Sequence, residues 1–319
     1  MRLVFMGTPE FAVPSLEILL AHHYDVAAVV TVPDKPQGRG RRVVPSPVKV
    51  AANAYNIPVL QPTSLKAPPF LEELASYRAS LQVVVAFRIL PQAVWAMPTL
   101  GTFNLHASLL PQYRGAAPIH WAIINGERET GVTTFFLAQT VDTGPMLFQE
   151  KEPIYADDTA GTLYKRLQHR GAKLVLKTVQ AIARGDYTKK PQEPTAESMR
   201  KKAPKITKKD CQISWDWTAD FVLNFIRGLA PYPAAWTLLN GQVYKILSAE
   251  KAAITLPHLG PGAVHSDGKN HIYVGTRDAP LAIKVLQRAG RKSMGVREFL
   301  RGHKLFNTIF EESKTTHHG

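Results

Sequence analysis

Residues 81–87 read Leu-Gln-Val-Val-Val-Ala-Phe, a nearly continuous apolar run with three consecutive β-branched side chains. Similar runs occur at residues 2–6, 26–31 and 57–60, and helix-compatible segments separate them. Strands that are apolar throughout, rather than alternating, are covered on both faces, which is typical of a parallel sheet between helices. We therefore predict a Rossmann-like α/β domain with a mostly parallel sheet. In such a sheet, ligands bind beyond the carboxyl ends of the strands.

The second half of the chain has a different texture. A long helical pattern at 159–184 is followed at 189–209 by a stretch rich in Lys, Pro, Thr and Glu, which indicates a linker. Beyond it, a helical pattern at 219–229 precedes short strand-like segments that predict a small antiparallel β-barrel. These segments lie at 235–239, 243–249, 262–264, 271–276 and 281–286. We expect an α/β domain over 1–188, a basic linker over 189–209 and a β-barrel domain over 210–319.

The charge of the 319-residue chain is unevenly distributed. Residues 1–150 carry 11 Lys/Arg against 10 Asp/Glu, whereas residues 151–319 carry 28 against 15, a net charge of +13. A neutral half joined to a basic half favours chemistry on a small molecule in the first and contact with a polyanion, such as nucleic acid, in the second. Basic surfaces also simply keep proteins in solution.

Other features of composition exclude several classes. With Cys211 alone there is no internal disulfide and no thiolate metal cage. No apolar run reaches about 18 residues, which excludes a transmembrane helix. The N-terminal residues lack the layout of a signal peptide, so we expect a cytoplasmic protein.

The densest polar cluster lies in residues 101–118. Asn104 and His106 are two positions apart at the end of a strand-like segment, so their side chains share one face. A second polar point is Asp142 in Val-Asp-Thr-Gly, where Gly144 allows the backbone to turn sharply. Each feature alone has a common structural explanation, as a hydrogen-bonded pair or a turn. A metal site at His106 and His120 lacks a third suitable ligand.

Together these residues match the needs of acyl transfer to an amine. The Asn104 amide and a protonated His106 would donate hydrogen bonds to the developing oxyanion. The Asp142 carboxylate would orient the imidazole and favour its charged form, or hold a water that relays protons. A directly attacking amine needs no nucleophilic side chain, and Ser108 lacks a GxSxG elbow, so we assign it a structural role.

Residues 104–111, Asn-Leu-His-Ala-Ser-Leu-Leu-Pro, followed by Tyr-Arg-Gly-Ala-Ala-Pro at 113–118, resemble the signature of the formyltetrahydrofolate-dependent formyltransferases. The resemblance extends to residues 5–12, 33–49, 129–134 and 142–144. Within this family, the chain is most similar to the members that act on methionyl initiator tRNA.

The resemblance implies that Asn104, His106 and Asp142 are the catalytic residues. It also implies that 10-formyltetrahydrofolate donates a formyl group to the α-amine of methionyl initiator tRNA, without a metal, and that the second domain is an OB-like barrel that binds tRNA. The family commonly has a glycine after the strand at 81–87. This chain has Arg88 there, in a loop that is one residue shorter, and we expect this difference to alter the rim of the folate pocket. The folate-binding residues implied are Val84, Ala86, Phe87, Ile89, Leu90, Ser108, Leu109, Leu110 and Pro111.

The segment 33–49 carries several cations among prolines and glycines. In isolation it is typical of a solvated surface loop, but the resemblance makes it a loop that contacts tRNA, with Arg39 and Arg42 as the best candidates. Trp215, Trp217 and Trp236 are interpreted as core residues rather than stacking platforms. The expected tRNA contacts are Lys35, Arg39, Arg41, Arg42, Lys208, Lys209, Arg291 and Lys292.

Three alternatives stay open. A sugar-nucleotide N-formyltransferase or a formyl-folate hydrolase domain would share the three polar residues, but neither calls for a basic second half. A non-catalytic RNA-binding protein on an α/β scaffold would have no use for them. We expect a monomer.

Overall fold

The computed structural model describes residues 1–37, 42–192, 201–253, 259–303 and 309–311. By its internal contacts the chain divides into two compact units, which are described separately. Unit 1 comprises Met1–Gly115, Glu129–Pro153 and Tyr164–Lys202, and unit 2 comprises Ala116–Arg128, Ile154–Leu163 and Ala203–Gly319. The domain boundaries expected at 1–188, 189–209 and 210–319 stay a prediction.

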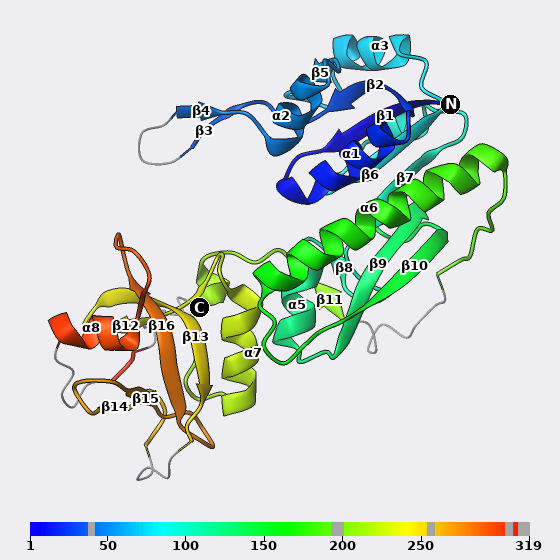
Figure 1. The fold of residues 1–319 in the computed structure, drawn as a ribbon. Coiled ribbons are helices and arrows are strands. Elements are labelled where there is room, and N and C mark those ends of the chain that lie inside the picture. The colour runs from blue at the N-terminus through cyan, green and yellow to red at the C-terminus, as the bar shows by residue number, and fades with distance from the viewer. Residues whose placement is uncertain (38–41, 193–200, 254–258, 304–308, 312–319) are drawn as a thin grey trace, which may run out of the picture. The chain divides into compact units, whose positions relative to one another are not determined.

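Unit 1 contains a seven-stranded sheet with the strand order β10-β9-β7-β6-β1-β2-β5 (Figure 1). The five strands from β7 to β5 in this order are parallel to one another. At the other edge of the sheet, β9 pairs antiparallel with β7, and β10 pairs antiparallel with β9. The prediction of a mostly parallel, Rossmann-like sheet is therefore confirmed. The strands are β1 (Arg2–Gly7), β2 (Asp25–Val30), β5 (Val59–Leu60), β6 (Leu81–Val85), β7 (Thr102–His106), β9 (Glu129–Phe136) and β10 (Met146–Pro153).

Helices cover both faces of this sheet, which explains the apolar strands. On one face, Met6 and Val84 form a core with Phe70 of α3 (Pro68–Ser76) and Val94 of α4 (Gln92–Trp95). On the other face lies α6 (Ala160–Arg184), where a side chain on Gly171 would collide with Leu105. All five residues of β6 are buried, as its sequence predicts. The remaining helices of this unit are η1 (Glu10–Ala12), α1 (Val13–Ala21) and α2 (Pro47–Ala54).

The segment 33–49 contains a short hairpin where the sequence analysis expects only a loop. β3 (Lys35–Gln37) pairs antiparallel with β4 (Arg42–Val44). Ser46 then caps α2 by accepting a hydrogen bond from the Lys49 N–H (3.1 Å). The hairpin projects from the body of unit 1 in Figure 1, and Val43 is 64% exposed. The hairpin therefore buries few side chains, and its sequence lacks the apolar pattern that predicts a strand.

Unit 2 is built on a curled, six-stranded antiparallel sheet, a half-barrel, which confirms the predicted small β-domain. Its core includes Phe225 of α7 and Phe299 of α8 packed on the strands. Trp215 is 2% exposed and Trp217 and Trp236 pack against this core, which confirms their interpretation. The elements are α5 (Pro118–Ile124), η3 (Lys209–Cys211), α7 (Ala219–Leu229), β12 (Ala235–Leu239), β13 (Gln242–Lys251), β14 (Val264–Ser266), β15 (Ile272–Val274), β16 (Leu281–Arg288), β17 (Met294–Gly295) and α8 (Val296–Gly302). Outside the two large sheets, β8 (Arg114–Gly115) pairs with β11 (Lys202–Ala203).

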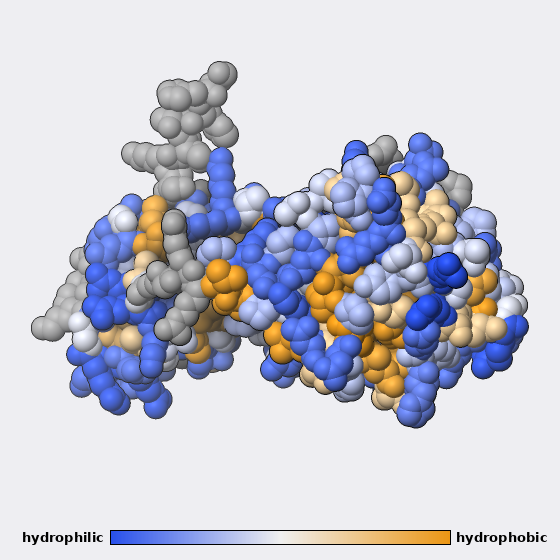
Figure 2. Space-filling view, turned by 90° about the horizontal axis from the view of Figure 1, so that it is seen from above, coloured by the Kyte–Doolittle hydropathy of each residue, from blue (hydrophilic) through white to orange (hydrophobic). Residues whose placement is uncertain are grey.

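The face seen in Figure 2 is largely hydrophilic, with hydrophobic residues in separate patches. This is ordinary for a folded protein, because apolar atoms always contribute much of the surface. Among the described residues, no helix combines the length and the apolar character needed to cross a membrane.

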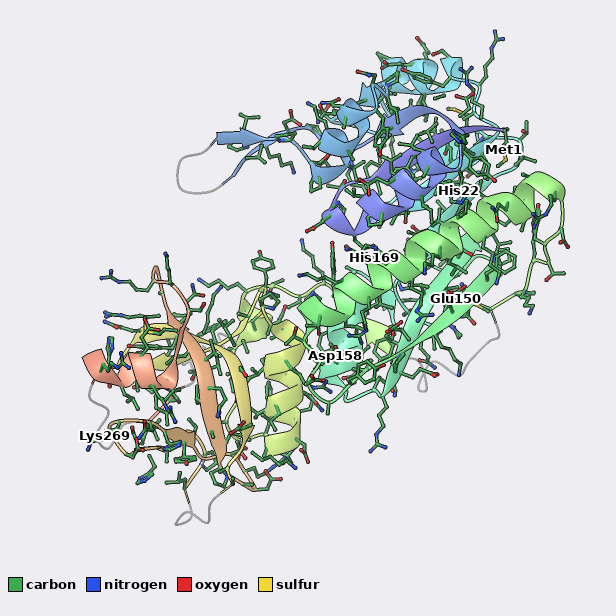
Figure 3. The ribbon with its side chains drawn as sticks, viewed as in Figure 1. Met1, His22, Glu150, Asp158, His169 and Lys269 are labelled. Carbon is green, nitrogen blue, oxygen red and sulfur yellow. The ribbon has the colours of Figure 1, made fainter. Side chains whose placement is uncertain are left out.

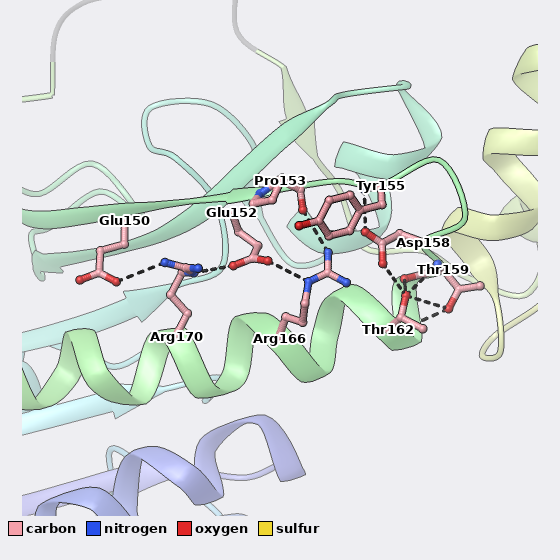
Figure 4. A network of polar contacts seen from close by, with 9 residues as sticks. All are labelled: Glu150, Glu152, Pro153, Tyr155, Asp158, Thr159, Thr162, Arg166 and Arg170. Carbon is pink, nitrogen blue, oxygen red and sulfur yellow. Dashed lines mark hydrogen bonds and ion pairs between the residues drawn. The ribbon is translucent and has the colours of Figure 1, made fainter.

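Two polar groups fix the long helix α6 to its surroundings. In unit 2, Asp158 lies just before the helix (Figure 3) and accepts hydrogen bonds from the Tyr155 N–H and the Thr162 hydroxyl, both at 2.8 Å. In unit 1, Glu152 of β10 is 4% exposed and pairs with Arg166 (2.8 Å) and with Arg170 of α6 (Figure 4). A buried carboxylate is tolerated here because both of its oxygens are paired.

Replacing Glu152 with glutamine should lower the free energy of unfolding by about 2 kcal/mol, because Arg166 and Arg170 lose the buried charge that both contact. Arg170 keeps its longer pair with Glu150 (3.8 Å). Urea denaturation measures this change. The matched control is Glu129→Gln, whose pair with Lys151 is exposed (48% and 73%) and should contribute less than about 1 kcal/mol. Equal effects of the two substitutions would contradict a stabilising role for the buried Glu152 pairs.

Candidate active site

The carboxyl ends of the parallel strands bring three loops to one edge of the sheet in unit 1. Gly7 of β1 is in register with Val85 of β6, and Val85 is in register with Leu105 of β7. The residues that follow, Thr8, Ala86 and His106, therefore lie side by side where such sheets bind ligands. Thr8 adds a buried hydroxyl that has no hydrogen-bond partner among the described residues. Sequence reasoning missed Thr8, although its place directly after a buried strand was a usable signal.

Asn104 and His106 project from the same face of β7, as predicted. Asn104 is in register with Val84, which belongs to the core beneath α3 and α4, so both side chains point to the face opposite α6. Within the described residues, no hydrogen bond engages the Asn104 side chain, which is half-buried. Its amide is therefore available to a substrate oxygen.

The ring of His106 is 6% exposed, and one contact fixes its orientation. Nε2 lies 2.8 Å from the carbonyl oxygen of Tyr113. A carbonyl only accepts, so Nε2 carries the proton and Nδ1 of the neutral ring is the acceptor. The Tyr113 N–H in turn donates to the carbonyl oxygen of Lys201 (2.6 Å). The chain between β7 and α5 thus sets the ring to present Nδ1.

Asp142 lies in a loop that is tied to the same segment. Its Oδ2 accepts a hydrogen bond from the Gly115 N–H (3.1 Å), two residues beyond Tyr113. Gln192 donates to the carbonyl oxygens of Asp142 and Gly144, both at 2.9 Å, and accepts from Arg114 Nε (3.0 Å). Within the described part of the chain, Asp142 and His106 form no direct hydrogen bond. Sequence reasoning missed Gln192, because nothing in a linker-like segment reveals a partner fifty residues away.

Gly144 is required for a reason other than the turning freedom expected from the sequence. Asp142, not Gly144, adopts the left-handed conformation (φ 56°). A Cβ on Gly144 would lie 1.8 Å from the carbonyl oxygen of Phe136. The glycine permits the Asp142 loop to pass close to the end of β9.

The residues expected to bind folate lie around this edge but differ in exposure. Among them Val84, Leu90, Ser108 and Leu110 are buried, whereas Ile89 is 75% exposed. Ala86 is exposed, and Phe87, Leu109 and Pro111 are half-buried. The Ser108 hydroxyl donates to the Gln112 carbonyl oxygen (2.7 Å), in keeping with a structural role. Folate binding by these nine residues stays a prediction.

Arg88 ties the loop after β6 to the loop after β5. Its guanidinium donates to the carbonyl oxygens of Pro62 (2.9 Å) and Thr63 (3.3 Å) and lies over the Phe87 ring, 5.3 Å from its centroid. Partial burial lowers the pKa of Arg88, but a guanidinium starts so high that it stays charged. The arginine at this position therefore anchors the rim of the candidate pocket.

The basic residues expected to contact tRNA are divided between the two units. In unit 1, Lys35 is exposed on β3 and Arg42 begins β4, while Arg39 and Arg41 lie outside the described residues. In unit 2, Lys208, Lys209, Arg291 and Lys292 are all exposed. Contact of these residues with tRNA stays a prediction.

A compact polar network holds the base of the β3–β4 hairpin. Lys49 Nζ donates to Asp34 Oδ2 (2.6 Å) and to Gln61 Oε1 (2.7 Å), and Gln61 Nε2 donates to Asp34 Oδ1 (2.7 Å). These hydrogen bonds lower the pKa of Asp34, Lys49 contributing most. A lowered carboxyl pKa means that the network is complete above the ordinary pKa of aspartate and is lost only as the pH falls through the lowered value. The hairpin base is therefore braced at neutral pH.

Two other features belong to unit 2. A cavity of about 820 Å³ in unit 2, between α7 and β13, is lined by none of the expected site residues. Burial raises the pKa of the Cys211 thiol to about 11, so it stays protonated at neutral pH. Within the described residues there is no group of three or more side chains suited to hold a metal ion.

The chain is similar to known proteins over nearly its whole length. Residues 1–179 match the family model "Formyl transferase" and residues 205–304 match "Formyl transferase, C-terminal domain". A methionyl-tRNA formyltransferase of Azobacteroides pseudotrichonymphae is 50% identical over 310 residues, 95% of this chain and 96% of that protein. One from Bacteroides fragilis is 48% identical over 311 residues, 96% of each chain.

Solved structures share the fold at lower identity. The N-formyltransferase of Helicobacter canadensis, in complex with folinic acid and dTDP-3-aminofucose, is 22% identical with a TM-score of 0.66 and covers 90% of this chain and 99% of its own. HypX of Aquifex aeolicus, in complex with tetrahydrofolic acid, is 20% identical with a TM-score of 0.64 over 98% of this chain and 51% of its own. At these identities the likeness concerns the fold. Two family models that together cover most of the sequence, and relatives at about half identity over nearly their whole length, establish that this chain belongs to the formyl transferase family.

Proposed function

We propose that this protein transfers the formyl group of 10-formyltetrahydrofolate to the α-amino group of methionyl initiator tRNA. The observation that carries the proposal is the 46–50% identity, over at least 95% of this chain, to proteins named methionyl-tRNA formyltransferase. The amide and imidazole at the carboxyl edge of the sheet supply the chemistry that this transfer needs. A cytoplasmic location belongs to the same proposal, and a monomeric state stays a prediction.

In the proposed mechanism, the α-amine attacks the formyl carbon, and a carbon–nitrogen bond to the amine replaces the bond to folate N10. Asn104 donates its side-chain N–H to the oxyanion of the tetrahedral intermediate. His106, expected from the sequence as a protonated donor to the oxyanion, is here assigned as a base: its Nδ1, oriented by the Tyr113 carbonyl, accepts the proton that the amine loses. That proton ends on the leaving folate nitrogen, so no net proton is gained or lost. Asp142 holds the water that relays it.

The sugar-nucleotide N-formyltransferase alternative is not favoured. The structures of such enzymes match this chain at 17–22% identity, which supports a common fold but no common acceptor. The proposal also accounts for the net charge of +13 in residues 151–319, since a tRNA presents many phosphates.

The direct test incubates the purified protein with 10-formyltetrahydrofolate and methionyl initiator tRNA and measures formylmethionine released from the tRNA. A UDP-amino sugar is the competing acceptor. Formylation of the sugar without formylation of the tRNA would overturn the proposal.

Arg42→Ala should raise the KM for tRNA about tenfold, because removing a cation from the β3–β4 hairpin weakens binding to phosphate. The KM for folate should change little, and the KM for tRNA should rise with salt. The control is Arg2→Ala, which also removes an exposed arginine. Arg2 pairs with Asp25 at the start of β1, whereas the candidate site lies at the carboxyl ends of the strands. A similar KM for tRNA in both variants would contradict the role of the hairpin.

A further inference from the structure

An exposed aromatic ring stands on the loop between α7 and β12. Tyr232 is 78% exposed, the highest value among the large hydrophobic side chains that the structure describes. The other aromatic residues near it in the sequence, Phe225 and Trp236, pack in or against the core of unit 2. A single exposed apolar side chain is common, but a tyrosine offers a flat ring for stacking and a hydroxyl for hydrogen bonding, which suits it for contact with a partner.

The backbone on both sides of Tyr232 is held in place. The Gly161 N–H donates to the Ala230 carbonyl oxygen (3.1 Å), and a Cβ on Gly161 would lie 2.6 Å from Pro231 Cδ. On the other side, Lys245 Nζ donates to the Pro233 carbonyl oxygen (3.1 Å). The ring is therefore presented by an ordered loop, and binding of a ligand to it costs little entropy for ordering the backbone.

Three lysines surround the start of β12. Lys245 lies directly opposite Trp236 in the β12–β13 pair, so their Cβ atoms are neighbours. The Trp236 indole N–H donates to the Lys208 carbonyl oxygen (2.8 Å), which places the exposed side chains of Lys208 and Lys209 next to this strand. The acidic residue among them, Asp210, accepts hydrogen bonds from the N–H and the hydroxyl of Thr207. The cluster keeps a surplus of positive charge.

We propose that Tyr232 stacks on a base of the acceptor tRNA while Lys208, Lys209 and Lys245 contact the neighbouring phosphates. An aromatic ring beside cations is the arrangement with which proteins bind nucleic acid without reading its sequence, since every base has a stacking face. This inference rests on the proposed function and adds to it a contact surface on unit 2 that involves Tyr232 and Lys245.

The test measures the Kd of initiator tRNA for the full-length protein by fluorescence anisotropy at several salt concentrations. Tyr232→Ala should raise the Kd about fivefold or more, with an unchanged slope of log Kd against log salt, because stacking releases no counterions. Tyr232→Phe and Tyr232→Trp should bind as the wild type does. The double variant Lys208→Met/Lys209→Met should instead flatten the salt dependence, by about 0.7–0.9 for each phosphate that the protein no longer neutralises.

The matched control is Tyr55→Ala, which removes an exposed tyrosine (53%) from the end of α2. A Kd for Tyr232→Ala equal to that of the control overturns the inference and leaves a protein partner as the reason for the exposed ring. So does a Tyr232→Phe variant as weak as Tyr232→Ala, because the ring is then not what binds. Failure of the wild type to formylate methionyl-tRNA would be a separate result, against the proposed function itself.

Discussion

Replacing His106 with alanine is expected to lower kcat for formyl transfer by about 10²- to 10⁴-fold, the contribution typical of a positioned general base. The ring is buried, and its Nε2 is engaged by the Tyr113 carbonyl. Nδ1 is therefore the nitrogen left to accept the proton of the attacking amine. The KM for folate should change much less than kcat, since the removed group acts on the amine during the reaction.

His106→Gln guards against a purely structural explanation, because its amide nitrogen can take the place of imidazole Nε2 as a donor to the Tyr113 carbonyl but is not basic. It should be as inactive as His106→Ala while keeping the wild-type midpoint in urea. The control is His22→Ala at the end of α1, an exposed position (Figure 3). Near-normal turnover by either His106 variant would falsify its assignment as the base.

Replacing Asn104 with alanine should lower kcat by about 10²- to 10³-fold, the loss typical of one oxyanion-hole donor. Within the described residues, no hydrogen bond engages its side chain. Removing the amide should therefore leave the stability of unit 1 almost unchanged. Single-turnover formylation with saturating folate and tRNA measures the chemical step directly.

Asn104→Asp sharpens this test, because a carboxylate of similar shape would repel the oxyanion. It should be less active than Asn104→Ala. Asn53→Ala, on the exposed side of α2, is the control for loss of an asparagine. If Asn104→Asp were more active than Asn104→Ala, the side chain would be acting by shape rather than as a hydrogen-bond donor.

Elements with strong local signals were predictable almost to the residue. α7 begins after Thr218, whose hydroxyl accepts from the Phe221 N–H, and β12 ends at Leu239, before Asn240-Gly241, where both residues have positive φ. β6 was predicted over 81–87 but ends at Val85, because Ala86 adopts φ 48° and leaves the strand. The β3–β4 hairpin was not predictable, because its short, exposed strands bury too little to produce a pattern.

The candidate site also has a part that the local sequence predicts and a part that it does not. Asn104 and His106 share a face because strands alternate with a period of two, a rule that acts within three residues. The proton left on Nε2 depends on Tyr113, and the position of the Asp142 loop depends on Gln192. These partners are separated along the chain and meet only once the sheet has folded.

The sequence by itself therefore determined the class of the fold, the polar pair at the end of one strand and the basic character of the second half. These properties follow from local periodicity and composition, which can be read from the sequence without knowing which residues meet in the fold. Only the tertiary structure decided which nitrogen of His106 is free, what holds Asp142 and where Tyr232 is exposed. Burial and hydrogen-bond partners are properties of residues brought together from distant parts of the chain, and no local pattern records them.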